Sequence, residues 1–222
     1  MNNMPEIFSL LKRLKENNNR EWYHEHKDEV DQLRKAFSDD VETLISGIGV
    51  LDPEIAYLQP SKAIFRLARD TRFSHDKTPY KTHFGAYIAP GGRRSPYGGY
   101  YLHVSPGESL LACGIWCPQP AALKLLRQEV FDHLDELLGI LESTPFSEYF
   151  MSFEGESLKR VPQPYTKEVF ARPELLKLKN YCMSCALSDE LFESPDWMTE
   201  VLRRCQIARP LNEFLNRAIR RS

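Results

Sequence analysis

The sequence lacks long hydrophobic runs. No window reaches the roughly eighteen uninterrupted apolar residues that indicate a transmembrane helix. No basic stretch precedes an apolar run near Met1, as a secretory signal requires. Cysteine is also sparse, because five thiols in 222 residues, an odd number, do not make the disulfide framework of a small secreted domain. We therefore expect a cytoplasmic protein with reduced thiols and no membrane partner.

The sequence also lacks a large excess of charge. Its formal net charge is −2, whereas domains that bind nucleic acid through the phosphate backbone are usually strongly basic. The charge is nevertheless uneven, because eight cations and two carboxylates between residues 60 and 100 give this stretch +6 and leave −8 for the rest. We expect no strong binding to nucleic acid, although the basic stretch suits a small anionic ligand.

Several catalytic signatures are missing as well. The chain has no Gly-x-x-x-x-Gly-Lys-Ser/Thr, Gly-x-Gly-x-x-Gly, Gly-x-Ser-x-Gly or His-Glu-x-x-His pattern. Nucleotide binding through a glycine-rich loop and zinc-protease chemistry are therefore unsupported. The remaining sequence identifies no cofactor.

What is present is typical of one globular domain spanning residues 1–222, with 42% hydrophobic and 27% charged residues. Apolar positions recur at helical spacing over residues 5–49 and 119–141, and a strand and further helices are expected over 173–219. Between them, residues 62–117 change to a period of two. The pattern predicts an α+β fold with an antiparallel sheet of about four to six strands. The expected strands are residues 63–68, 84–89, 100–105, 110–116 and 181–187.

The densest polar segment begins within the first of these expected strands. It reads Arg66-x-x-Arg69-Asp70-x-Arg72-Phe73, then Asp76-Lys77 and Tyr80. This pattern resembles the signature of a family of bacterial proteins of about this length, domain of unknown function 2461. The similarity extends to residues 19–22, 101–107, 114–116 and 158–160, so that it covers nearly the whole chain. The resemblance implies membership of the family but carries no activity, cofactor or residue role over to this chain.

The cations of this segment suit an anion site, because guanidinium groups bind phosphate or carboxylate through two parallel hydrogen bonds. The expected anion-binding residues are Arg66, Arg69, Arg72, Lys77, Tyr80 and Lys81. In this interpretation the protein is an enzyme or a ligand-binding domain that acts on a small phosphorylated or carboxylated molecule.

A second interpretation stays open, in which Asp70 and Asp76 pair with the arginines. The cluster is then an internal salt-bridge network that braces a turn, and the protein is a non-catalytic interaction module. If the first strand continues to Asp70, alternation places Arg69 on the apolar side, where it would need Asp70, Asp76 or Glu108 as a partner.

His83 and His103 are the candidate catalytic residues, because histidine titrates near neutral pH without help from its surroundings. Alternation places Tyr101 and His103 on one face of a strand, and His83 and Gly85 on one face of its neighbour. If both faces lie on the side of Arg66, histidine, tyrosine and arginine line one pocket. The alternative role for either histidine is a structural hydrogen bond.

Four cysteines fall in two pairs, Cys113 with Cys117 and Cys182 with Cys185, which is the number that a structural zinc ion needs. Zinc pairs usually lie on a tight turn, whereas Cys182 and Cys185 fall in an expected strand and point to opposite faces. We therefore expect no metal and buried, reduced thiols.

Overall fold

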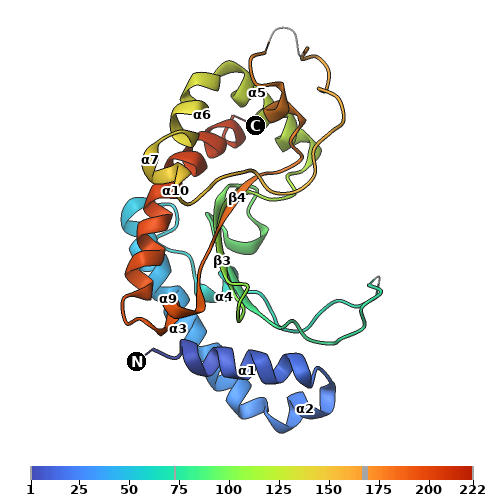
Figure 1. The fold of residues 1–222 in the computed structure, drawn as a ribbon, viewed down its shortest axis with the longest axis vertical. Coiled ribbons are helices and arrows are strands. Elements are labelled where there is room, and N and C mark those ends of the chain that lie inside the picture. The colour runs from blue at the N-terminus through green and yellow to red at the C-terminus, as the bar shows by residue number, and fades with distance from the viewer. Residues whose placement is uncertain (1, 73, 167–169, 222) are drawn as a thin grey trace. The chain divides into compact units, whose positions relative to one another are not determined.

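The computed structural model describes residues 2–72, 74–166 and 170–221. The chain divides into two compact units, each built from segments that are far apart in sequence (Figure 1). Unit 1 comprises Met1–Arg93, Tyr101–Leu111 and Ala186–Arg203, and unit 2 comprises Arg94–Tyr100, Ala112–Cys185 and Arg204–Ser222. No helix of the described ranges is long and apolar enough to span a bilayer.

Unit 1 begins with helices α1 (Met4–Glu16), α2 (Arg20–Glu25) and α3 (Lys27–Leu51), which lie side by side in Figure 1. Pro5 occupies the first turn of α1, where its lack of a backbone N–H costs no hydrogen bond within the helix. The Asn19 side chain caps α2 by accepting a hydrogen bond from the amide of Trp22. The apolar stripes of α1 and α3 are buried, as their periodicity predicts.

The helical spacing over residues 5–49 continues past Trp22 and predicts an unbroken helix there, which is wrong at His26. The backbone of His26 leaves helical geometry between α2 and α3. Its ring stacks on Trp22 with 4.0 Å between the centroids, and its Nδ1 lies 2.9 Å from the Trp22 carbonyl oxygen. These contacts satisfy the end of α2 locally, so that the chain turns before α3 begins.

The sheet contains four strands in the order β1 (Phe84–Ile88), β2 (Gly99–Val104), β3 (Leu110–Ile115) and β4 (Tyr181–Ala186), and it is antiparallel. The predicted α+β class is therefore confirmed. The strand expected over residues 63–68 is wrong: Pro60 starts the short helix α4 (Pro60–Ala63), and only isolated bridges join Ile64 to Ala86 and Ala68 to Tyr80. A 3₁₀ turn, η1 (Gly92–Arg94), lies between β1 and β2.

In unit 2, α5 (Pro120–Asp132) and α6 (Leu134–Leu141) replace the single helix expected over residues 119–141, because His133 leaves helical geometry between them. Two short helices follow, α7 (Thr144–Ser147) and α8 (Pro173–Lys177). The last two helices are α9 (Asp189–Glu193), in unit 1, and α10 (Trp197–Ile219), which keeps Pro210 inside it without splitting.

Buried amides hold the part of α10 that lies in unit 2 to neighbouring backbone. Asn212 accepts a hydrogen bond from the amide of Gly114 and donates one to the carbonyl of Gly99. Asn216, one turn later, bonds in the same way to the amide and carbonyl of Gly98. Only glycine fits at position 114, because its φ is +100° and an added Cβ would lie 2.0 Å from the Tyr181 carbonyl oxygen.

Candidate functional site

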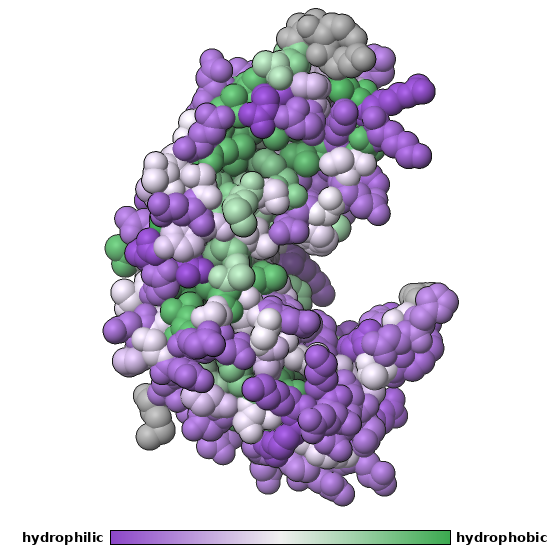
Figure 2. Space-filling view, viewed as in Figure 1, coloured by the Kyte–Doolittle hydropathy of each residue, from purple (hydrophilic) through white to green (hydrophobic). Residues whose placement is uncertain are grey.

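The described residues between α4 and β1 form an irregular hairpin, which we call the basic hairpin (residues 64–72 and 74–83). Its two arms pair through backbone hydrogen bonds from Phe65 to Gly85, from Arg69 to Pro79 and from Lys81 to Leu67. These few bonds hold the arms together without forming regular strands. The hairpin is the teal segment between α4 and the sheet in Figure 1, and its exposed surface is largely hydrophilic in Figure 2.

The tip of the basic hairpin is held by charge pairs. Arg69 donates hydrogen bonds to the Asp76 carboxylate and to the Thr78 hydroxyl. The Arg72 guanidinium binds Asp70 through Nε and Nη2, at 2.9 and 2.7 Å. The pairing with Arg69 lowers the pKa of Asp76 to about 2, and the hydrogen bond from Arg72 lowers that of Asp70.

Exposure to water limits how much these ion pairs stabilise the fold. The Arg72 side chain is 77% exposed and that of Asp70 is 45% exposed, so that water competes for both groups. Lys77 donates a hydrogen bond to the Thr71 carbonyl oxygen at 2.9 Å. The structure thus places Arg69, Arg72 and Lys77 in contacts that brace the tip.

Tyr80 joins the hairpin to the turn between α1 and α2. The Asn18 side chain accepts a hydrogen bond from the Tyr80 amide and donates one to its carbonyl, at 3.0 and 2.9 Å. The Tyr80 ring stacks on Tyr23 with 4.0 Å between centroids and 8° between the ring planes. Tyr80, which the sequence assigns to anion binding, therefore lies in a packing contact of unit 1.

Beyond Tyr80, the imidazole of His83, which directly precedes β1, meets the imidazole of His103 and the phenol of Tyr101 from β2, and we call this group the imidazole face. The rings of His83 and His103 lie 4.1 Å apart between centroids, and the Tyr101 hydroxyl lies 3.1 Å from Nδ1 of His103. Gly85 makes room for the phenol, because a Cβ there would lie 2.8 Å from the Tyr101 hydroxyl oxygen. His83 and Gly85 therefore face Tyr101 and His103, as the alternation of side chains along the sequence predicts.

Lys81 lies beside the imidazole face. Its ammonium is 5.1 Å from the centroid of the Phe65 ring, within the range of a cation–π contact. Among the described residues, the Lys81 ammonium has no hydrogen bond or ion pair with a carboxylate. Burial, followed by the positive charges of Arg66 and Arg69, lowers the pKa of Lys81.

The same environment keeps the histidines neutral. Burial lowers the pKa of His83 to about 4, with further contributions from His103 and Lys81. Burial also lowers the pKa of His103, and Lys81 adds to this while Glu108 opposes it. Burial raises the pKa of Tyr101. At neutral pH the group therefore comprises two neutral imidazoles and a neutral phenol next to cations, an arrangement that can accept or donate protons.

The structure separates the predicted site residues into two groups. One group brings together Lys81, His83 and His103. Arg66 is exposed, but its positive charge still lowers the pKa of Lys81. Arg69, Arg72 and Lys77 bind partners within the tip, and Tyr80 packs on Tyr23. The sequence interpretation did not assign Phe65 to the site, and it placed Tyr101 there only on condition that both strand faces lie on the side of Arg66. The signal for Tyr101 was its alternation with His103, whereas no local signal places Phe65 under Lys81.

The cysteines do not form a metal centre. Cys113, Cys182, Cys185 and Cys205 are buried, and Cys117 is exposed. Burial raises the pKa of Cys182 to about 12 and that of Cys113 well above its usual range, so that both stay protonated. In the described ranges, no three His, Cys, Asp or Glu side chains are grouped so as to hold a metal ion.

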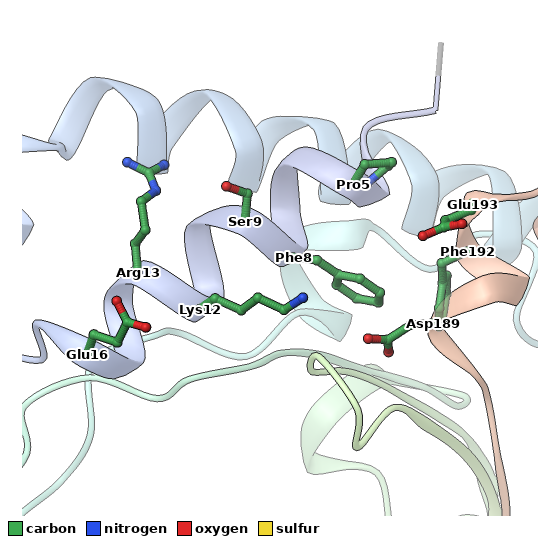
Figure 3. A pocket seen from close by; sticks show the side chains of 9 residues that line it. All are labelled: Pro5, Phe8, Ser9, Lys12, Arg13, Glu16, Asp189, Phe192 and Glu193. Carbon is green, nitrogen blue, oxygen red and sulfur yellow. The ribbon is translucent and has the colours of Figure 1, made fainter.

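A separate cavity of about 390 Å³ lies between α1 and α9 in unit 1 (Figure 3). The rings of Phe8 and Phe192 meet edge to face, with 5.5 Å between their centroids. Lys12 and Asp189 also line the cavity. Cations and carboxylates both line it, so its charge favours neither anions nor cations. The cavity contains none of the residues that the sequence analysis assigns to a site.

The chain matches a known protein family over most of its length. The family whose sequence profile matches is described as conserved hypothetical protein (DUF2461), and the match covers residues 6–214. No curated protein and no solved structure gives a significant match.

Proposed function

The chain belongs to the conserved hypothetical family DUF2461, and we propose that it is an enzyme or ligand-binding domain for a small phosphorylated or carboxylated molecule. The ligand would bind at the imidazole face, with its anionic group near Lys81 and Arg66. In an enzyme, His83 and His103 would exchange protons with the bound molecule. The cytoplasm is the proposed location, because all five cysteines are free thiols.

The single observation that carries this proposal is the charge around Lys81. The ammonium is half-buried and lies beside Arg66, Arg69 and two imidazoles, while the described part of the chain supplies no carboxylate partner. A positive charge withdrawn from water without a counter-ion is unfavourable. A bound phosphate or carboxylate would remove this cost, and the cations would favour the anion in return.

Proton transfer is the chemistry that the histidines support. Neutral imidazole accepts a proton from a substrate, and the hydrogen bond between Tyr101 and His103 offers a path for moving it onward. A bound anion would also stabilise the protonated imidazoles. Ligand binding should therefore be accompanied by proton uptake near neutral pH.

The proposal is tested by thermal denaturation of the wild-type protein in phosphate, sulfate and a panel of phosphorylated and carboxylated metabolites. A ligand that binds only the folded state, present at about 100 times its Kd, stabilises it by about 2.7 kcal/mol, and the Tm rises by several degrees. Lys81→Met should abolish the rise. Lys62→Met is the matched control, because Lys62 is an exposed lysine on α4 and lies outside the imidazole face.

Binding of a ligand with the same affinity by the wild type and Lys81→Met would contradict the assigned site. The absence of any anion-dependent shift across the panel would contradict the proposed function. Calorimetric titrations in buffers of different ionisation enthalpy measure the proton uptake directly.

The contacts at the tip favour a second candidate function. Pairing of Arg69 with Asp76 and of Arg72 with Asp70 balances charge near the exposed end of the basic hairpin without any ligand. Such a tip suits a non-catalytic module that binds a partner protein. This alternative predicts that Arg69→Ala lowers partner binding and tip order, while anions leave the Tm of the wild type unchanged.

A further inference from the structure

The cavity between α1 and α9 combines a cation, carboxylates and two aromatic rings. Helical spacing brings these groups to the cavity, because residues three or four positions apart share one face of a helix. Phe8 and Lys12 are four positions apart in α1, and Asp189 is followed three and four positions later by Phe192 and Glu193 in α9. Both helices belong to unit 1, and no residue of the imidazole face lines the cavity.

Contacts within unit 1 hold the walls of this cavity in place. The rings of Phe8 and Phe192 pack edge to face across it. The Asn2 side chain donates a hydrogen bond to the Phe192 carbonyl oxygen at 2.6 Å, which ties the start of the chain to α9. The Asp189 carboxylate accepts a hydrogen bond from the amide of Gly107 at 2.8 Å. The walls are therefore formed before a ligand arrives, which lowers the entropic cost of binding.

The opposite charges at the cavity do not pair with each other. Among the described residues, neither Lys12 nor Glu193 forms a hydrogen bond or an ion pair. In the same part of the chain, the Asp189 carboxylate bonds only to the amide of Gly107. Figure 3 shows the side chains of Lys12 and Asp189 pointing toward each other from the two helices, beside the Phe8 ring. The gap between them separates a cation from a carboxylate by more than the roughly 4 Å of an ion pair.

Arg13 and Glu16 also line the cavity but lie away from this gap. Arg13 forms an ion pair with Glu29 of α3, and its guanidinium lies 5.9 Å from the centroid of the Trp22 ring. In Figure 3 the Arg13 side chain points away from α9, and Glu16 lies beside Arg13 at the end of the cavity farthest from α9. Lys12 is therefore the cation that faces a ligand next to the aromatic rings.

We propose that this cavity binds a free α-amino acid with an apolar side chain. The α-carboxylate accepts hydrogen bonds from the Lys12 ammonium, and the α-ammonium donates hydrogen bonds to Asp189 and Glu193. The apolar side chain lies against the Phe8 ring. The volume of about 390 Å³ lies within the roughly 300 to 1,000 Å³ of small-molecule sites. This site does not depend on the proposed function of the imidazole face.

The mixture of charges selects a zwitterion over simpler ions. A dianion would gain from Lys12 but would be repelled by Asp189 and Glu193, and a diamine would be repelled by Lys12. An α-amino acid carries both charges on adjacent groups, so that each meets its opposite. Its primary ammonium has three N–H donors for the carboxylates, whereas a quaternary ammonium has none.

The experiment is isothermal titration calorimetry of the full-length protein with L-leucine and two of its derivatives. L-Leucine amide lacks the carboxylate, and N-acetyl-L-leucine lacks the ammonium. We expect each derivative to bind at least about tenfold more weakly than L-leucine, because each loses hydrogen bonds between charged groups. Glycine should also bind more weakly than L-leucine, since it has no side chain to cover the Phe8 ring.

Variants assign each charge of the ligand to its partner. Lys12→Met should weaken L-leucine binding by at least about tenfold, yet bind L-leucine amide as the wild type does, because the amide has no carboxylate to lose. Asp189→Asn keeps an acceptor for the amide of Gly107 but removes the charge, so it should weaken L-leucine and spare N-acetyl-L-leucine. Lys15→Met is the matched control, because Lys15 is an exposed lysine of α1 outside the cavity, and it should leave all affinities unchanged.

Three results would overturn the amino-acid site. The first is that none of L-leucine, L-methionine and L-phenylalanine binds the wild-type protein at millimolar concentration. The second is that L-leucine amide binds at least as tightly as L-leucine, which would make the cavity a site for cations. The third is that Lys12→Met binds L-leucine as tightly as Lys15→Met does. Stabilisation by phosphate through Lys81 is measured separately, so the failure of either proposal leaves the other standing.

Discussion

At the scale of single residues, burial controls the chemistry of the imidazole face. His83 and His103 are only partly accessible to water, and cations lie nearby, so both rings favour the neutral form. Lys81 is subject to the same two effects. Protonation of the two imidazoles is therefore disfavoured, and the Lys81 ammonium loses its proton more readily than that of an exposed lysine.

The protonation of His83 makes stability depend on pH. The imidazole has a pKa of 6.5 in the unfolded chain and of about 4 in the folded protein. Between these values the unfolded state binds more protons, so the stabilisation present above pH 6.5 is lost as the pH falls towards 4. His83→Asn should therefore reduce the fall in Tm between about pH 7 and about pH 5.

His75→Asn is the control for this measurement, because His75 is exposed near the tip of the basic hairpin. It should leave the slope of Tm against pH as it is in the wild type. An unchanged slope in His83→Asn would show that His83 is protonated alike in the folded and unfolded states.

Single-residue periodicity predicts part of this site. Alternation of side chains along two adjacent strands places Tyr101 and His103 on one shared face. The same alternation places His83 opposite them. The contact of Lys81 with Phe65 does not follow, because it depends on how the irregular arms of the hairpin pair. The partner of Arg69 is also beyond local rules, since Asp70 and Asp76 are equally plausible from spacing alone.

At the scale of elements, regular strands were easier to predict than the basic hairpin. The four strands of the sheet lie where the period of two places them. Residues 63–68 have the same pattern, but Pro60 begins a helical turn and only two bridges form along the arm. The breaks at His26 and His133 were missed for a related reason, because the apolar stripe continues past each break and conceals it.

A buried carboxylate stabilises the helical part of unit 2. Glu129 of α5 is 1% exposed, and it accepts hydrogen bonds from Arg217 of α10 and from Arg221, both at 2.6 Å. Glu129→Gln should lower the free energy of unfolding by about 1.5 to 3 kcal/mol, because two charge-assisted hydrogen bonds weaken together. The Tm would fall by several degrees.

Glu136→Gln provides the comparison. Glu136 also binds Arg217, but its side chain is 47% exposed, so its loss should cost less than about 1 kcal/mol. Urea denaturation of both variants measures the difference. Equal effects of the two substitutions would mean that the burial of Glu129 adds nothing to its pairing.

At the scale of the whole molecule, the charge distribution argues against tight binding to duplex DNA. The stretch with +6 is offset by −8 elsewhere, and Asp70 and Asp76 already neutralise two arginines at the hairpin tip. Fluorescence anisotropy at physiological salt should therefore detect at most the weak, non-specific affinity of about 10⁻⁴ to 10⁻⁶ M. Submicromolar binding that declines steeply with added salt would refute this expectation.

The division into two units is the feature least accessible from the sequence. Two of the boundaries between the units fall inside strands, one within β2 and one within β3. A boundary that falls inside strands leaves no change of composition to detect.

The interleaved units bear on how the protein folds as it leaves the ribosome. Met1–Arg93 emerges long before Ala186–Arg203, the segment that completes unit 1. At the usual elongation rates the interval is roughly 5 to 20 s. Throughout it, Phe8 of α1 lacks Phe192 of α9, its edge-to-face partner, so an apolar surface stays uncovered. Unit 1 can therefore complete its folding only after Ala186–Arg203 has emerged, and until then we expect the nascent chain to be prone to aggregation through this apolar surface.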